Sequence, residues 1–151
     1  MRELLDDPDV DHWTPVPSPF DPAAARRHLE RAHEVRAAGT GLHLAITRDG
    51  GTPLGEVLIF VRDGAPRDSW EIGYLTGAAH RRQGLAVSSV AALVAAAAAS
   101  GLRRFVLRIE PANAASTAVA ARCGFRLAAG PPQVQESKGR RIELGVWELT
   151  L

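Results

Sequence analysis

Hydrophobic and polar residues alternate with a period of two in the first half of the chain. The clearest run is 42–48, in which leucine and isoleucine alternate with histidine, alanine and threonine. Runs 54–62 and 70–76 have a similar strand-like composition, and the turn sequence Asp-Gly-Gly at 49–51 follows the first run. This half of the chain therefore predicts three strands in an antiparallel meander.

One helix is predicted before the meander. Segment 20–39 has Asp21 in a capping position, Pro22 in the first turn and Gly39 at the far end. Segment 1–20 carries four prolines and is predicted to be irregular.

The hydrophobic period changes to that of a helix in the second half. Segment 84–100 has valines at helical spacing, and its small side chains would let it lie close to a sheet. Segment 103–110 predicts a strand, 113–123 a short helix, and 125–128 and 141–149 two further strands around a loop. The order predicts an α/β fold, with a mixed but mostly antiparallel sheet, one strand–helix–strand crossover and flanking helices.

Length and composition limit the class of protein. The 151 residues fit a single domain, and a net charge of +1 argues against a general nucleic-acid or membrane binder. Cys123 is alone, which excludes an intramolecular disulfide and a cysteine zinc cluster. His28 and His33 are five residues apart on the predicted helix and do not share a face, so no metal site is expected. The acidic start is unlike a signal peptide, and a cytoplasmic protein is predicted.

The stretch Arg81-Arg82-Gln83-Gly84-Leu85-Ala86 precedes the alanine-rich helix. A helix start presents unpaired N–H groups and a partial positive charge, so it binds phosphate. Gly84 would let the backbone wrap an anion, and Ala86 keeps the next approach narrow. Five arginines and no acidic residue lie between His80 and Ile109, which adds a positive local field. The stretch therefore predicts a pyrophosphate cradle; a tight turn with solvated arginines is the alternative.

Three spaced motifs strengthen the phosphate hypothesis. EIGYLT (71–76), RRQGLA (81–86) and NAASTAVAARCGF (113–125) together resemble the GNAT family of acyl-CoA N-acyltransferases, and more narrowly its RimJ/RimL-like branch. The resemblance implies a GNAT fold and acetyl-CoA as co-substrate, with the pantetheine arm between the third meander strand and the strand after the main helix. The cofactor-binding residues that it implies are Leu75, Thr76, Arg81, Arg82, Gln83, Gly84, Leu85, Ala86, Val87 and Asn113.

Two features depart from this family pattern. Relatives in the branch begin with an extra strand and helix, where this chain has only 1–6, so the N-terminus is expected to be shortened. Many members also carry a tyrosine on the helix after the asparagine, as the acid for the leaving thiolate. Here that position is Ala120, and the only tyrosine is Tyr74 on the preceding strand. In this branch a serine can serve instead, and Ser116 matches it.

The general base is predicted from position along the strands. Glu71 begins the strand that leads to the cleft and is the first candidate, acting through water; an ordinary strand-end glutamate is the alternative. Glu136 and then Glu56 follow as candidates. Loop 129–140 is expected to border the acceptor pocket, where its glutamines and Glu136 would suit a cationic or polar amine.

The function predicted is transfer of an acetyl group from acetyl-CoA to a primary amine, either a protein N-terminus or a small molecule, directly within a ternary complex. The alternative is a non-catalytic acyl-CoA-binding or interaction module with a degenerate GNAT fold. A homodimer is compatible with either. The sequence leaves open the identity of the amine and the choice between acetyl and longer acyl donors.

Overall fold

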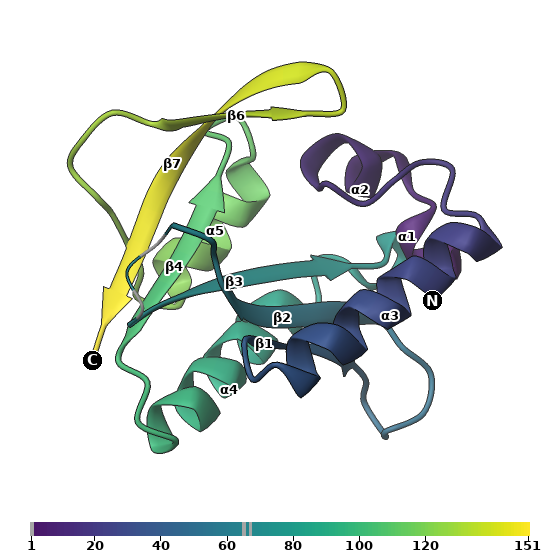
Figure 1. Cartoon of the computed structure of the whole chain (residues 1–151), viewed down its shortest axis with the longest axis horizontal. Helices are drawn as coiled ribbons and strands as arrows, with labels where there is room; N and C mark the ends of the chain where they lie inside the picture. The colour runs from purple at the N-terminus through teal and green to yellow at the C-terminus, as the bar shows by residue number, and fades with distance from the viewer. Residues whose placement is uncertain (1, 65, 67) are drawn as a thin grey trace.

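The chain folds around one mixed sheet, seen in the computed structural model, which describes residues 2–64, 66 and 68–151 (Figure 1). The strands are β1 (Gly41–Ile46), β2 (Gly55–Val61), β3 (Ser69–Thr76), β4 (Arg104–Ile109), β5 (Arg126–Leu127), β6 (Gln133–Ser137) and β7 (Arg140–Thr150). Their order in the described part of the chain is β1-β2-β3-β4-β7-β5, with β6 paired to β7. Among these described strands, β3 and β4 form the one parallel pair. The predicted α/β fold with a mostly antiparallel sheet is confirmed.

The helices are α1 (Arg2–Leu5), α2 (Pro8–Trp13), α3 (Pro22–Ala37), the short 3₁₀ helix η1 (Ala78–His80), α4 (Leu85–Ala99) and α5 (Ala114–Arg122). The helix predicted within 20–39 is confirmed as α3. Asp21 caps its start, and Gly39 adopts a positive φ of 66° just after its end.

Two predictions from the prolines and glycines were wrong. Segment 2–20 is not wholly irregular, because the Asp7 side chain caps Pro8–Trp13 and Pro8 stands in the first turn, where its missing N–H costs nothing. Position 1 lies outside the described residues. The predicted loop 129–140 contains β6, which forms a hairpin with β7 through Lys138 and Gly139, both with positive φ.

Helices α4 and α5 cover one face of the sheet. Alternate strand residues on this face, including Val57, Ile72 and Phe105, pack with Val90 of α4 and Ala120 of α5 in the main core. The many alanines of α4 allow this close approach. These contacts fix the start of α4 and the first turn of α5 at the edge of β3.

Helix α3 lies across the opposite face, over β1 and β2 (Figure 1). Because neighbouring strand residues point to opposite faces, this face receives Glu56, Glu71 and Arg108. Its small hydrophobic cluster is formed by Leu5, Val10, Phe20 and Ala24, with Leu75 packed against them. Among the described residues, no helix is both long enough and apolar enough to cross a membrane.

Candidate active site

The start of α4 has the geometry of an anion cradle. Arg82 and Gly84 both adopt left-handed backbone conformations, with φ of 60° and 76°, and Leu85 begins the helix. No side chain caps the N-terminus of α4, so its first N–H groups remain available to a ligand. A Cβ at Gly84 would meet no protein atom within 4 Å, so the space beside it is open. Alternating left-handed residues of this kind form a backbone nest that suits phosphate.

The two arginines that precede the cradle differ in their surroundings. Arg81 forms ion pairs with Asp7 and Asp9 and also donates from Nε to the Thr76 carbonyl at 3.4 Å. Its guanidinium therefore joins α2 to the end of β3. The sequence instead predicts a phosphate as the partner of Arg81. Arg82 is exposed in the loop that directly precedes α4.

Gln83 is tied to the protein on both sides. Its Oε1 accepts a hydrogen bond from Arg48 at 2.7 Å, and its Nε2 donates to the Ala79 carbonyl at 3.2 Å. The side chain thus braces the loop, and the backbone of Gln83 is what remains to face an anion.

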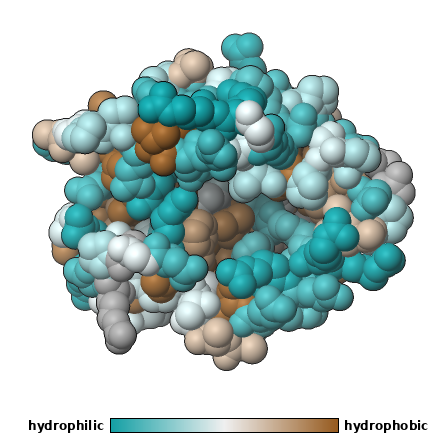
Figure 2. Space-filling view, turned by 45° about the horizontal axis from the view of Figure 1, so that its top comes forward, coloured by the Kyte–Doolittle hydropathy of each residue, from teal (hydrophilic) through white to brown (hydrophobic). Residues whose placement is uncertain are grey.

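Strands β3 and β4 splay apart, as the family resemblance implied. They pair only from Ser69 with Arg104 to Glu71 with Val106, although β3 continues to Thr76 and β4 to Ile109. Beyond Glu71 the two strands leave a V-shaped opening whose wide end lies near the start of α4. Figure 2 shows a hollow in the surface, with hydrophobic residues at its floor and hydrophilic residues around it.

The register of β3 corrects one predicted contact. The Gly77 N–H donates to the Leu54 carbonyl, and Leu75 lies opposite Glu56 of β2. Since hydrogen-bonding direction alternates along an antiparallel strand, the backbone groups of Leu75 face β2. The backbone groups of Tyr74 and Thr76 face the splay instead.

A pair of hydroxyl groups links the two sides of the splay. The Tyr74 hydroxyl of β3 lies 2.7 Å from Ser116 Oγ in the first turn of α5. Asn113 caps α5 by accepting the Ser116 N–H on Oδ1 at 3.0 Å, which leaves its amide nitrogen for a ligand. Burial raises the pKa of Tyr74 to about 12, against the opposing effect of the bond to Ser116. Tyr74 is therefore protonated and can donate at neutral pH.

Glu71 sits at the apex of the splay between two arginines. Arg62 donates to both of its carboxylate oxygens, at 3.2 and 3.1 Å, and Arg108 forms a second ion pair with it. Gln135 and Gln133 of β6 in turn accept hydrogen bonds from Arg62 at 2.8 Å and from Arg108 at 2.6 Å. The glutamines predicted to line the acceptor pocket therefore lie near Glu71. Their hydrogen bonds go to its two arginine partners.

Burial lowers the pKa of Arg108, with Glu71 acting against that shift and Arg62 adding to it. The network has two guanidinium groups for one carboxylate, so one positive charge is in excess at this point of the sheet. Glu136, the second candidate base, is exposed on β6 and lies opposite Arg141 of β7.

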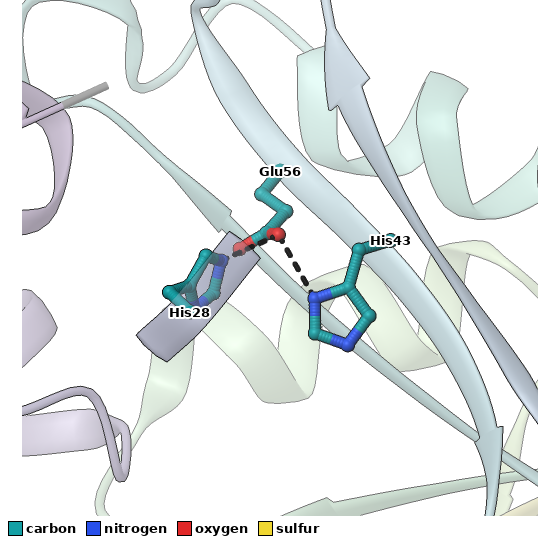
Figure 3. A group of neighbouring side chains, drawn as sticks. All are labelled: His28, His43 and Glu56. Atoms are coloured by element: carbon teal, nitrogen blue, oxygen red, sulfur yellow. Dashed lines mark hydrogen bonds and ion pairs between the residues drawn. The ribbon is translucent and has the colours of Figure 1, made fainter. Parts of the chain in front are cut away.

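Glu56 belongs to a cluster that the sequence did not predict (Figure 3). Its Oε1 lies 2.9 Å from His28 Nε2 of α3 and 3.2 Å from His43 Nδ1 of β1. Burial alone would raise the pKa of Glu56, but the bonds to His28 and His43 outweigh it and lower the pKa to about 2. The bond to Glu56 likewise raises the pKa of His28, against burial. The available signal was the alternation of β1 and β2, which places His43 and Glu56 on one face.

Comparison with known proteins decides the family. Residues 1–126 match the family described as "Acetyltransferase (GNAT) domain". The chain belongs to the GNAT acetyltransferase family. Among solved structures, a GNAT-family acetyltransferase from Bacillus anthracis superposes with a TM-score of 0.82 at 16% identity, covering 99% of this chain and 86% of that one. RimJ from Mycobacterium smegmatis, in complex with CoA-disulfide, gives a TM-score of 0.79 at 22% identity, covering 98% and 73%.

A closer sequence relative is the L-methionine sulfoximine/L-methionine sulfone acetyltransferase of Pseudomonas aeruginosa. It is 39% identical over 71 residues, which are 47% of this chain and 41% of the relative. The alignment therefore spans less than half of either protein. The predicted GNAT resemblance is confirmed, and RimJ is among the structural neighbours.

This GNAT chain differs at the position where many members place a tyrosine. Ala120 of α5 occupies it and is fully buried in the main core. A phenol nevertheless reaches the first turn of α5, because Tyr74 approaches from β3. Tyr74 and Ser116 are 42 positions apart in the sequence. The packing of α5 against the sheet brings their hydroxyl groups together.

Proposed function

We propose that this chain is an acetyl-CoA-dependent N-acetyltransferase that acylates a primary amine directly within a ternary complex. The observation that carries the proposal is the anion cradle at the start of α4, at the wide end of the opening between β3 and β4. Membership of the GNAT family supports the same reading. A cytoplasmic location, a homodimer and independence from nucleic acids stay predictions.

The residues present fit acetyl-CoA. The open space beside Gly84 and the uncapped N–H groups of Leu85, Ala86 and Val87 suit its pyrophosphate, with Arg82 adding charge. The amide nitrogen of Asn113 and the splay-facing N–H of Thr76 suit the amides of the pantetheine arm. When bound, acetyl-CoA supplies the acetyl group as a thioester.

The chain's own residues would then position the reactants and move protons. The Tyr74 N–H also faces the splay and would donate to the thioester carbonyl oxygen. Ser116 would donate its Oγ proton to the departing sulfur, and the Tyr74 hydroxyl would return a proton to Ser116 along their 2.7 Å contact. This replaces the tyrosine that many relatives carry at the position of Ala120. Water would restore the proton of Tyr74, and the proton that the amine loses on acylation balances the sum.

Glu71 remains a candidate base for the amine proton, acting through water. Its carboxylate oxygens already accept hydrogen bonds from Arg62 and Arg108, so proton acceptance would require one arginine to move. These contacts favour a second role, in which Glu71 orients the arginines towards the acceptor. Glu136, exposed on β6, stays the second candidate base. Glu56 is disfavoured, because its carboxylate is buried, is bound by His28 and His43, and has a pKa of about 2.

The acceptor that fits best is a small amine that also carries a carboxylate, such as an amino acid or its analogue. The excess positive charge around Arg62 and Arg108 would attract that carboxylate. The named activity of the Pseudomonas relative, on methionine sulfoximine and sulfone, is consistent with this class. A protein N-terminus is the other acceptor.

The deciding experiment measures release of free CoA thiol from acetyl-CoA across amino acids, their carboxamides and short peptides. Mass spectrometry then identifies the acetylated amine. We expect turnover on at least one amine, with amino acids preferred over the matching carboxamides. Binding of CoA by calorimetry with no acetylated product from any acceptor would support the alternative, a non-catalytic acyl-CoA-binding module.

A further inference from the structure

We propose that His28, His43 and Glu56 form a binding site for a divalent transition-metal ion, with Zn²⁺ as the best match. The three ligand atoms come from α3, β1 and β2, and all lie within 4.8 Å of one another (Figure 3). This site is separate from the cradle and from the Glu71 network. The proposal goes beyond the acetyltransferase function and does not depend on it.

The ligand set is one that zinc accepts. Two imidazole nitrogens and one carboxylate oxygen are the protein ligands of open zinc sites, whose fourth position is left to water or another small ligand. With bonds of about 2.1 Å, a tetrahedral zinc site keeps its ligand atoms roughly 3.4 Å apart. The two measured separations, 2.9 and 3.2 Å to Glu56 Oε1, are close to that value. Small side-chain rotations would open room for the ion.

The burial of the cluster is the second observation. The Glu56 side chain is only 4% exposed, yet its Oε2 has no hydrogen-bond partner among the described residues. Buried carboxylate oxygens are normally paired, and an unpaired one costs free energy. A cation beside Glu56 would satisfy both oxygens. The histidine side chains, 18% and 15% exposed, still leave a path for an ion to enter.

In the metal-free protein, protons occupy the histidine nitrogens that would bind the metal. Each imidazole nitrogen that contacts Glu56 Oε1 must carry a proton to make that hydrogen bond. To coordinate a metal, each nitrogen must present a lone pair, so its proton moves to the other ring nitrogen of a neutral imidazole or leaves an imidazolium for the buffer. Metal and protons therefore compete for the site, and affinity should increase with pH.

A bound metal would join α3 to the two strands beneath it. The described contacts of α3 with β1 and β2 otherwise include the edge-on packing of His28 against His43, with ring centroids 5.4 Å apart. Coordination would fix α3 on the face of the sheet that carries Glu71 and Arg108. The effect expected is higher thermal stability of the whole chain.

The test is titration of the EDTA-treated full chain with ZnCl₂ by calorimetry, at two pH values. We expect one Zn²⁺ per chain and tighter binding at the higher pH. Co²⁺ should give the visible absorption of a tetrahedral site. His43→Ala and Glu56→Gln should each weaken binding at least tenfold. His33→Ala is the matched control, because His33 is exposed on the same helix outside the cluster.

Stoichiometric binding lost in His43→Ala but kept in His33→Ala establishes the site. Circular dichroism must show that each variant is folded, and His43→Asn gives a second variant if His43→Ala is not. Absence of stoichiometric binding by the wild type would overturn the proposal. Binding that survives both His43→Ala and Glu56→Gln would also overturn it, since the ion would then sit elsewhere. A positive amine-acetylation assay would be unaffected by either result.

Discussion

The Tyr74 hydroxyl on β3 lies 2.7 Å from Ser116 Oγ on α5 and 3.2 Å from the Ser116 carbonyl. This contact joins the strand on one side of the splay to the helix that follows the strand on the other side. It also places a protonated phenol behind the serine expected to serve the leaving sulfur. The hydroxyl pair is therefore the part of the site most directly open to mutation.

Ser116→Ala should lower the turnover number while leaving CoA affinity nearly unchanged. Loss of a general acid typically costs roughly 10²–10⁴-fold in rate. Tyr74→Phe should give a smaller loss, because it removes only the second hydroxyl of the pair. Thiol release measures the rate and calorimetry the affinity. Thr117→Ala is the control, since the next helical residue points about 100° away. Wild-type rates in Ser116→Ala would exclude the proton-donor role.

Gly84→Glu should abolish CoA binding and leave the fold intact. The variant puts bulk and negative charge into the open space where the pyrophosphate is expected. Any non-glycine residue is also strained at a φ of 76°, so a control is needed. Gly39→Glu provides it, because Gly39 has a φ of 66° and open surroundings, and it lies at the opposite end of β1 from Arg48, which contacts the cradle loop through Gln83. Calorimetry that finds CoA bound equally by both variants would refute the cradle.

Arg82→Ala should weaken CoA binding and flatten its dependence on salt. The physical reason is that exposed charge pairs are screened by added salt, so removing one charge removes part of the slope. Arg81→Ala should affect the slope less, since Arg81 is held by Asp7 and Asp9. The measurement is CoA affinity at several salt concentrations. Equal slopes in wild type and Arg82→Ala would assign Arg82 to the solvated surface.

Asp7→Asn should destabilise the protein at neutral pH but not in acid. Burial raises the pKa of Asp7, but the bonds from Arg81 and from backbone N–H groups outweigh it, and the net pKa falls below 3.8. A lowered pKa stabilises the fold above the unfolded-state value, and this stability is lost as pH falls through the folded-state value. Asparagine keeps the helix cap, so only the charge is removed.

We expect a difference of about 1 kcal/mol in the free energy of unfolding at about pH 7, which shrinks as the pH falls below 3.8 through the lowered folded-state pKa. Urea unfolding at several pH values measures it. Asp9→Asn is the comparison, because Asp9 also pairs with Arg81 but its side chain is 63% exposed. A pH-independent difference for Asp7→Asn would mean that its charge does not hold α2.

Glu71→Gln should separate proton transfer from positioning. If Glu71 orients Arg62 and Arg108, the variant should raise the KM for the amine and keep the acid limb of the pH–rate profile. Loss of the carboxylate also leaves the largely buried Arg108 without its ion pair, which we expect to cost on the order of 3 kcal/mol in unfolding free energy. If Glu71 is the base, the acid limb should change and kcat should fall.

The sequence alone determined the order of most elements. Periods of two and 3.6 residues are local properties of a strand or helix that buries one face, so they can be read without knowing the partner. The helix caps Asp21 and Asn113 were likewise predictable, because a cap bonds to its own helix. The cradle was predictable for the same reason, since Arg82, Gly84 and the start of α4 are adjacent in the chain.

Tertiary structure decided which distant side chains meet. Arg81 was assigned to a phosphate, but the folding of α2 onto the end of β3 gives it Asp7 and Asp9. The alternation of hydrogen bonds along β3, fixed by its register with β2, turned Leu75 away from the splay. Tyr74 reaches Ser116, and His28 reaches His43 and Glu56, through packing between elements that no local pattern encodes. Local patterns specify which face of each element is buried, whereas pairing and packing between elements specify the partners of its polar side chains.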